Sequence, residues 1–177
     1  MSQDVDSTEP LAEAPPRTLT VSWEDPAALG ATARSRDGLS FLQAMIDGEL
    51  PSAPIQQLLG FVLEEVEKGR AVFSAVPGEQ HYNPIGVVHA GLAATMLDSA
   101  MGVAVHTTLE LGSGYTTLET KFNLVRAITA ETGRIVCEGR IVHRGGRVAT
   151  CEGYLRRDSD GALLAHGTST CMVMSAG

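Results

Sequence analysis

The sequence predicts an α+β protein in which one sheet wraps around a single long helix. The helix is expected over residues 86–105, where small and apolar residues occur on every side, as they do in a buried helix. Two strand-like runs precede this segment and four follow it. A helix that is apolar all round needs cover on every side. In a chain of 177 residues, which suggests one domain, the sheet is the element that can supply it.

Residues 1–37 differ from the rest and are interpreted as a flexible, acidic N-terminal extension. They contain seven acidic residues, three arginines and no sustained periodicity, and they carry −4 of the formal net charge of −8. Four prolines also lie there, at positions 10, 15, 16 and 26. Residues 38–177 form the predicted folded domain.

The domain is expected to open with a short amphipathic helix within residues 39–50, which Pro51 and Pro54 terminate. Two strands follow at residues 58–66 and 70–76, joined by a tight turn at 67–69. Beyond the long helix, strands are expected at residues 115–125, 133–143, 147–157 and 162–174. Gly145-Gly146 and residues 158–161 provide hairpin turns between the last three, so these four strands are predicted to form a meander.

Composition and charge exclude several classes of function. The net charge of −8 is the opposite of what a nucleic-acid-binding protein needs. No apolar run is long enough to span a membrane, and the acidic start of the chain lacks the apolar core of a secretory signal. The three cysteines form no CxxC pair, and the histidines share no ligand spacing, so neither a disulfide framework nor a metal site is expected. A reducing, cytoplasmic location fits this cysteine usage best.

Asp98 is the most informative residue of the long helix. No cation lies three or four residues away from it, so an ionised carboxylate here has no local partner. One interpretation is a partly exposed aspartate, or one that a tertiary hydrogen bond satisfies. The other is a carboxylate placed in a cleft as a nucleophile or general base. The sequence leaves both open.

The start of this helix suggests a second half of the same site. Residues 83–86 read as a turn, and the first N–H groups of a helix lack intrahelical partners, so they can stabilise an oxyanion. Asp98 lies about eight residues further on, which corresponds to ~12 Å along a helix. That distance is too long for one carbonyl group, so we expect a dimer in which a second subunit brings its own Asp98 to this helix end.

The segment NPIGVVHAGLAATMLDSAMG, together with GYTTLETKFNLVRAI and the later HRGGRVATCEGYLRRDSDGALLAHGTST, resembles the PaaI-type acyl-CoA thioesterases of the hotdog fold. The resemblance covers residues 38–174. It implies a curved antiparallel sheet around the helix and assembly into homodimers or homotetramers. It also implies thioester hydrolysis with no cofactor, since coenzyme A is part of the substrate.

The resemblance assigns roles to six residues. Asp98 takes the place of the nucleophile or general base, and Thr117 that of a hydroxyl which orients water or the carboxylate. Asn83 and the main-chain N–H of Ala90 take the places of the groups that polarise the thioester carbonyl. His89 and Gly91 complete the family's His-Gly-Gly motif, in which Ala90 replaces the first glycine and adds a β-carbon.

Five arginines between residues 140 and 157 form a basic stretch in an otherwise acidic protein. Arg144 and Arg147, and with lower priority Arg126, are candidates for contacts with the phosphates of coenzyme A. A solvated hairpin edge is the alternative interpretation of the stretch. The main alternative to an enzyme is a non-catalytic acyl-CoA-binding protein, a sensor or carrier of the same fold, and a structural domain without a ligand is a third. The acyl group is not specified, and phenylacetyl and medium-chain groups both fit.

Overall fold

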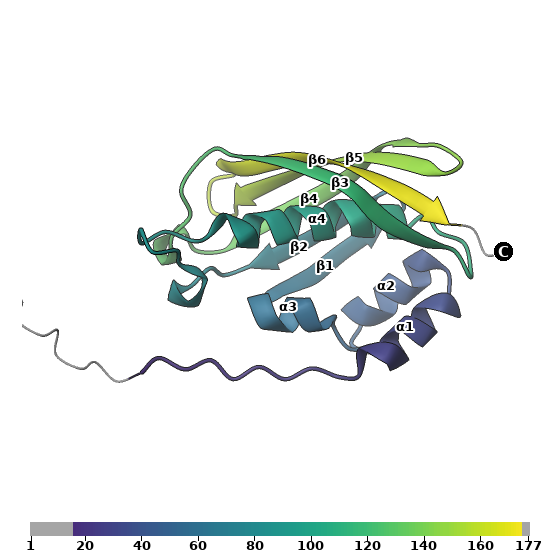
Figure 1. Cartoon of the computed structure of the whole chain (residues 1–177), viewed down its shortest axis with the longest axis horizontal. Coiled ribbons are helices and arrows are strands. Elements are labelled where there is room, and N and C mark those ends of the chain that lie inside the picture. Colours follow the sequence, from purple (N-terminus) through teal and green to yellow (C-terminus); the bar gives the residue numbers. More distant parts are fainter. Residues whose placement is uncertain (1–15, 175–177) are drawn as a thin grey trace, which may run out of the picture.

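In the computed structural model, which describes residues 16–174, a six-stranded antiparallel sheet curves around one long helix (Figure 1), and this confirms the predicted architecture. The helices are α1 (Pro26–Arg34), α2 (Gly38–Ile46), α3 (Pro54–Leu59) and α4 (Ala90–His106). The strands are β1 (Phe61–Glu67), β2 (Arg70–Ala75), β3 (Gly114–Leu124), β4 (Ile135–Arg144), β5 (Val148–Arg157) and β6 (Leu163–Met174). No helix among the described residues is long and apolar enough to cross a membrane.

Two short helices were not anticipated from the sequence. Asp25 caps α1 by accepting the N–H of Ala27 at 2.9 Å, and Pro26 occupies its first turn, as helix starts favour. The helix α3 also has a proline, Pro54, in its first turn, although its N-cap residue Ala53 makes no side-chain cap, and it ends at Gly60, whose φ of 63° is left-handed. The strand expected from residue 58 therefore starts at Phe61. Residues 1–15 of the predicted extension lie outside the described part, and residues 16–25 form no regular element.

The order of the strands differs from the expected four-stranded meander. The sheet order is β1-β2-β4-β5-β6-β3, so only β4, β5 and β6 form a meander. The strand β3 pairs with β6, from Gly114 opposite Met174 to Leu124 opposite Ala165, and it lies at an edge of the sheet. The connection after β3 spans residues 125–134 and includes a 3₁₀ turn, which is long enough to cross the sheet instead of forming a tight hairpin.

The core lies between α4 and the concave face of the sheet. Met96, Leu97 and Met101 of α4 are completely buried. On β4, Gly139 lets the helix approach closely, because a β-carbon there would lie 2.3 Å from the carbonyl carbon of Ala100. The remaining fully buried side chains include the three cysteines, Cys137, Cys151 and Cys171.

The helix α4 is not covered on all sides, contrary to the expectation from its apolar sequence. Gly91, Ala94, Thr95, Asp98 and Ser99 follow one face of the helix at intervals of three and four residues, and all are only half-buried. The sheet therefore covers most of the helix and leaves one stripe, which contains Asp98, partly open.

Candidate active site

The first turn of α4 keeps one main-chain donor free. His89 is the N-cap residue, and its Nδ1 atom accepts the N–H of Gly91 at 2.8 Å. The N–H of Ala90 has no partner among residues 16–174. Ala90 has a negative φ, as do all described residues other than glycine, so the β-carbon that replaces the family glycine is accommodated without strain. Gly91 was also expected to be part of the site, but its N–H already donates to His89.

Asn83 lies in the turn that leads to this helix end. Its Oδ1 atom accepts the N–H groups of Ile85 at 3.0 Å and Val87 at 3.3 Å, which shapes the turn. The side-chain amide therefore presents its two N–H bonds away from the turn. The segment is anchored further where the N–H of Val88 donates to Ile128 at 2.8 Å and that of His89 to His81 at 2.7 Å.

A cavity of about 340 Å³ opens at the N-terminal end of α4. Val88, Ala93, Leu124 and Ile128 contribute apolar walls. The polar groups at its surface come from residues that the sequence had singled out, namely Asn83, His89, Ala90 and Arg126. An apolar cavity with a few convergent donors is the usual form of a small-molecule site.

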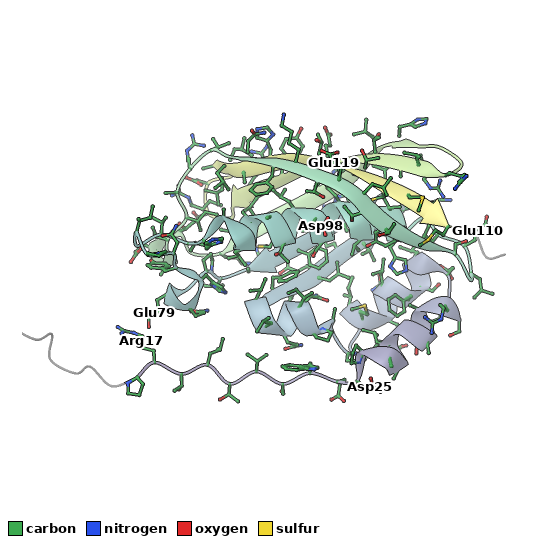
Figure 2. All side chains as sticks on the ribbon, viewed as in Figure 1. Arg17, Asp25, Glu79, Asp98, Glu110 and Glu119 are labelled. Carbon is green, nitrogen blue, oxygen red and sulfur yellow. The ribbon has the colours of Figure 1, made fainter. Side chains whose placement is uncertain are left out.

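Asp98 lies in the middle of α4, beneath the strand that carries Glu119 (Figure 2). Its Oδ1 atom accepts a hydrogen bond of 2.9 Å from the Thr120 hydroxyl. No described cation lies within salt-bridge distance of the carboxylate. The carboxylate is thus satisfied by a tertiary hydrogen bond and is only partly buried, which are both features of the first interpretation drawn from the sequence. Its role as a nucleophile or general base stays a prediction.

Thr120 is the residue that sequence reasoning missed. Thr117 was expected to orient water or the carboxylate, whereas the hydroxyl that contacts Asp98 is that of Thr120. The pairing of β3 with β6 shifts between Thr117 and Glu119, which marks a β-bulge. The bulge moves the inward-facing positions along by one, so Thr117 lies opposite Cys171 and Thr120 lies opposite Ser169. Both β6 partners are buried. Strict alternation from Thr117 would have placed Thr120 on the outer face.

The arginines of the basic stretch do not form one patch. Arg144 folds back onto its own hairpin, where it donates to the carbonyl groups of Gly145 and Gly146. Arg144 pairs with Ala149, and Arg156 and Arg157 lie seven and eight residues further along β5, which corresponds to ~25 Å. A larger depression of about 740 Å³ lies beside Arg144. Arg70, which also lines this depression, already forms ion pairs with Glu67 and Glu138.

Arg126 lies next to the cavity at the start of α4. Its Nη1 atom donates to the Leu163 carbonyl at 2.6 Å, and the side chain is otherwise exposed. From the sequence, Arg126 was a candidate of lower priority than Arg144 and Arg147. The structure brings it nearer to Asn83 and Ala90 than its sequence spacing suggests. Among the described residues, no three His, Cys, Asp or Glu side chains gather to hold a metal ion.

Comparison with known proteins connects this geometry to a family. Residues 85–164 match the thioesterase superfamily. A phenylacetic acid degradation-related protein of Ralstonia eutropha JMP134 is 32% identical, with a TM-score of 0.66, and the match covers 74% of this chain and 98% of that one. The chain belongs to the thioesterase superfamily. The hotdog fold, implied by the resemblance, is confirmed.

Solved structures of lower sequence identity share the fold. A conserved protein of Pseudomonas aeruginosa is 27% identical over 70% of this chain and 95% of its own, with a TM-score of 0.64. A hypothetical thioesterase of Streptococcus pneumoniae, solved with coenzyme A, is 20% identical over 66% of this chain and 87% of its own, with a TM-score of 0.59. No curated protein matches the chain. The region of the chain that matches the superfamily includes His89, Ala90, Asp98 and Thr120.

Proposed function

We propose that this protein is an acyl-CoA thioesterase that hydrolyses a thioester to a free acid and coenzyme A. The observation that carries the proposal is the Ala90 N–H, which has no partner among the described residues and belongs to a residue that lines an apolar cavity together with Asn83. A helix N-terminus with a free donor stabilises the negative oxygen that forms when a thioester carbonyl is attacked. Asn83 supplies a second donor to the same oxygen.

Asp98 supplies the carboxylate that starts the reaction. As a general base it takes a proton from water, and the hydroxide attacks the carbonyl carbon. As a nucleophile it attacks the carbonyl itself and forms an anhydride that water then hydrolyses. In both routes the C–S bond breaks and the thiolate leaves readily, so a strong general acid is not required.

The two halves of the site belong to different subunits in this proposal. Ala90 and Asp98 are eight residues apart on α4, about 12 Å along the axis, so one carbonyl cannot meet both within one chain. The strand β3 borders the open stripe of α4 and has a free edge of eleven residues. Pairing of two β3 edges around a two-fold axis would bring the partner's helix alongside and complete two equivalent sites.

Coenzyme A is the proposed thiol carrier. The Streptococcus pneumoniae relative that was solved with coenzyme A supports this assignment. Arg126 is the first candidate for a phosphate contact, because it lies beside the cavity, and Arg144 and Arg147 follow. The description of the Ralstonia relative places phenylacetyl-CoA first in a substrate panel, ahead of medium-chain acyl-CoAs.

A subunit-mixing experiment tests this proposal. Ala90→Pro removes the N–H at the first position of α4, where proline is tolerated, and His89 before it already has an extended ψ of 139°. Asp98→Asn removes the carboxylate. Each variant alone should release little free thiol from acyl-CoA. After joint refolding, half of the dimers carry one intact site, so about a quarter of the wild-type rate should return.

Two results would contradict the proposal in different ways. A mixture that stays inactive while wild-type protein is active would show that the site lies within one subunit. A wild-type protein whose melting temperature rises with acyl-CoA but which releases no thiol would be the non-catalytic binding protein instead. Refolding of the wild-type protein by the same procedure is the control for recovery.

A further inference from the structure

Two hydroxyl groups of the sheet follow one another in a hydrogen-bonded row that ends at Asp98. Thr120 of β3 and Ser169 of β6 are paired residues of the sheet, and their side chains both point toward α4. The Thr120 Oγ1 atom lies 2.9 Å from Asp98 Oδ1 and 3.3 Å from Ser169 Oγ. Ser169 is only 2% exposed, so water does not compete for its hydroxyl.

The number of protons on each hydroxyl group defines which group donates in each hydrogen bond. Each hydroxyl has one proton to donate and can accept from others. The Ser169 proton goes to the main-chain carbonyl of Glu119 at 3.0 Å, so Ser169 meets Thr120 as an acceptor. The Thr120 proton thus has two acceptors, the Asp98 carboxylate and the Ser169 oxygen. The carboxylate takes it while charged, because bonds to ionised acceptors are the stronger ones.

We propose that Thr120 and Ser169 are positioning residues that hold Asp98 by its Oδ1 atom and adapt to its change of charge. The bond from Thr120 leaves Oδ2 as the oxygen that meets water or the thioester. When Asp98 becomes neutral, by taking a proton from water or by forming an anhydride, Oδ1 becomes a weaker acceptor. The Thr120 proton can then turn to Ser169, so no buried hydroxyl loses its partner during the reaction.

This inference rests on the proposed thioesterase function, and a double-mutant cycle tests it. Thr120→Val keeps the shape of the side chain and removes the hydroxyl, and Thr120→Ser restores the hydroxyl. Ser169→Ala removes the second acceptor together with the donor to the Glu119 carbonyl. Thr168→Val is the matched control, since Thr168 lies beside Ser169 on β6, is exposed and makes no side-chain hydrogen bond among the described residues.

The expected result is a loss in kcat with little change in KM. Thr120→Val should lower kcat by up to about 10²-fold, as misplacement of a reacting group does. Thr120→Ser should recover most of this loss, and Thr168→Val should cause a much smaller one. Ser169→Ala should lower kcat less than Thr120→Val, and adding it to Thr120→Val should lower kcat no further, because the second acceptor acts only through Thr120.

Several outcomes of these cycles would contradict the proposal. If the losses in kcat from Thr120→Val and Ser169→Ala multiply, or if Thr168→Val lowers kcat as much as Thr120→Val, the two hydroxyls do not act on Asp98 as a unit. A second cycle on melting temperature, with Asp98→Ala and Thr120→Val, needs no activity. Each variant removes one partner of the bond, so the double variant should melt no lower than the less stable single variant. Additive shifts would overturn this inference, whereas absence of wild-type turnover would overturn the proposed function alone.

Discussion

The imidazole of His89 accepts the main-chain N–H of Gly91 at 2.8 Å. A neutral ring that accepts at Nδ1 carries its proton on Nε2, so His89 acts as the N-cap of α4 and not as a general base at that atom. The bond ties the residues on either side of Ala90 to one another. The Gly91 N–H is thereby satisfied, while the N–H of Ala90, which lines the cavity, has no partner among the described residues.

Removal of the His89 ring should act mainly by weakening the start of α4, and it should slow the reaction through that loss of structure. His89→Ala should lower the free energy of unfolding by about 1 kcal/mol, as loss of an N-cap does, and should reduce kcat as the first turn loosens. His89→Asn, which keeps a capping acceptor, should recover both. Chemical denaturation and thiol-release assays measure the two effects. Recovery of stability without recovery of kcat would assign the ring a direct role in the reaction.

Asp98→Asn should lower kcat by about 10²- to 10⁴-fold, the range associated with loss of a general base, while KM for acyl-CoA changes little. The amide retains the shape of the side chain and can still accept from Thr120, so the melting temperature should stay close to that of the wild type. Glu119→Gln, on the neighbouring strand and exposed, is the matched control for loss of one negative charge. An unchanged kcat in Asp98→Asn would exclude this carboxylate from the mechanism.

Glu64 should make stability depend on pH in the acid range. Burial alone would raise the pKa of this carboxyl, but hydrogen bonds from Arg134 and Ser74 outweigh burial, so its pKa lies below the ordinary 4.5. A lowered pKa in the folded state stabilises the protein above pH 4.5, and the contribution is lost as pH falls through the lowered value.

Glu64→Gln should therefore destabilise the protein at pH 7, by about 1 kcal/mol for a partly exposed pair, and the difference should shrink below pH 4.5. Thermal melts of both proteins between pH 3 and 7 measure it. Glu110→Gln, on an exposed loop with no ion pair among the described residues, should show no such trend. A difference that grows toward low pH would have the wrong sign for this explanation.

The edge of β3 should be required for both assembly and activity. Leu118, at the bulge of this strand, is 57% exposed in the single chain. Leu118→Asp places a charge on each of two facing edges, so like charges should oppose pairing. Light scattering after size exclusion should then report a smaller particle, and thiol release should fall with it. Val142→Asp, equally exposed on β4 away from this edge, is the control. An active monomeric Leu118→Asp protein would contradict a site shared between subunits.

Local patterns in the chain already specify most of the elements and the central carboxylate. The apolar composition of α4, the glycine turns between β4, β5 and β6, and the partnerless Asp98 are all short-range features, so they can be read from neighbouring residues. Recognition of Asn83, His89 and Ala90 also depended on a continuous stretch. The helices α1 and α3 were missed although their Asp25-Pro26 and Pro54 starts are local signals.

Long-range contacts decided the rest. The position of β3 at the sheet edge depends on pairing with β6, about fifty residues away, and no local pattern records it. The bulge in β3 shifts which side chains face inward, so it exchanges Thr117 for Thr120 as the partner of Asp98. The same folding brings Arg126 to the start of α4 and leaves Arg144 on its own turn. Side-chain identity sets what a residue can do, but pairing across the sheet sets which residues meet.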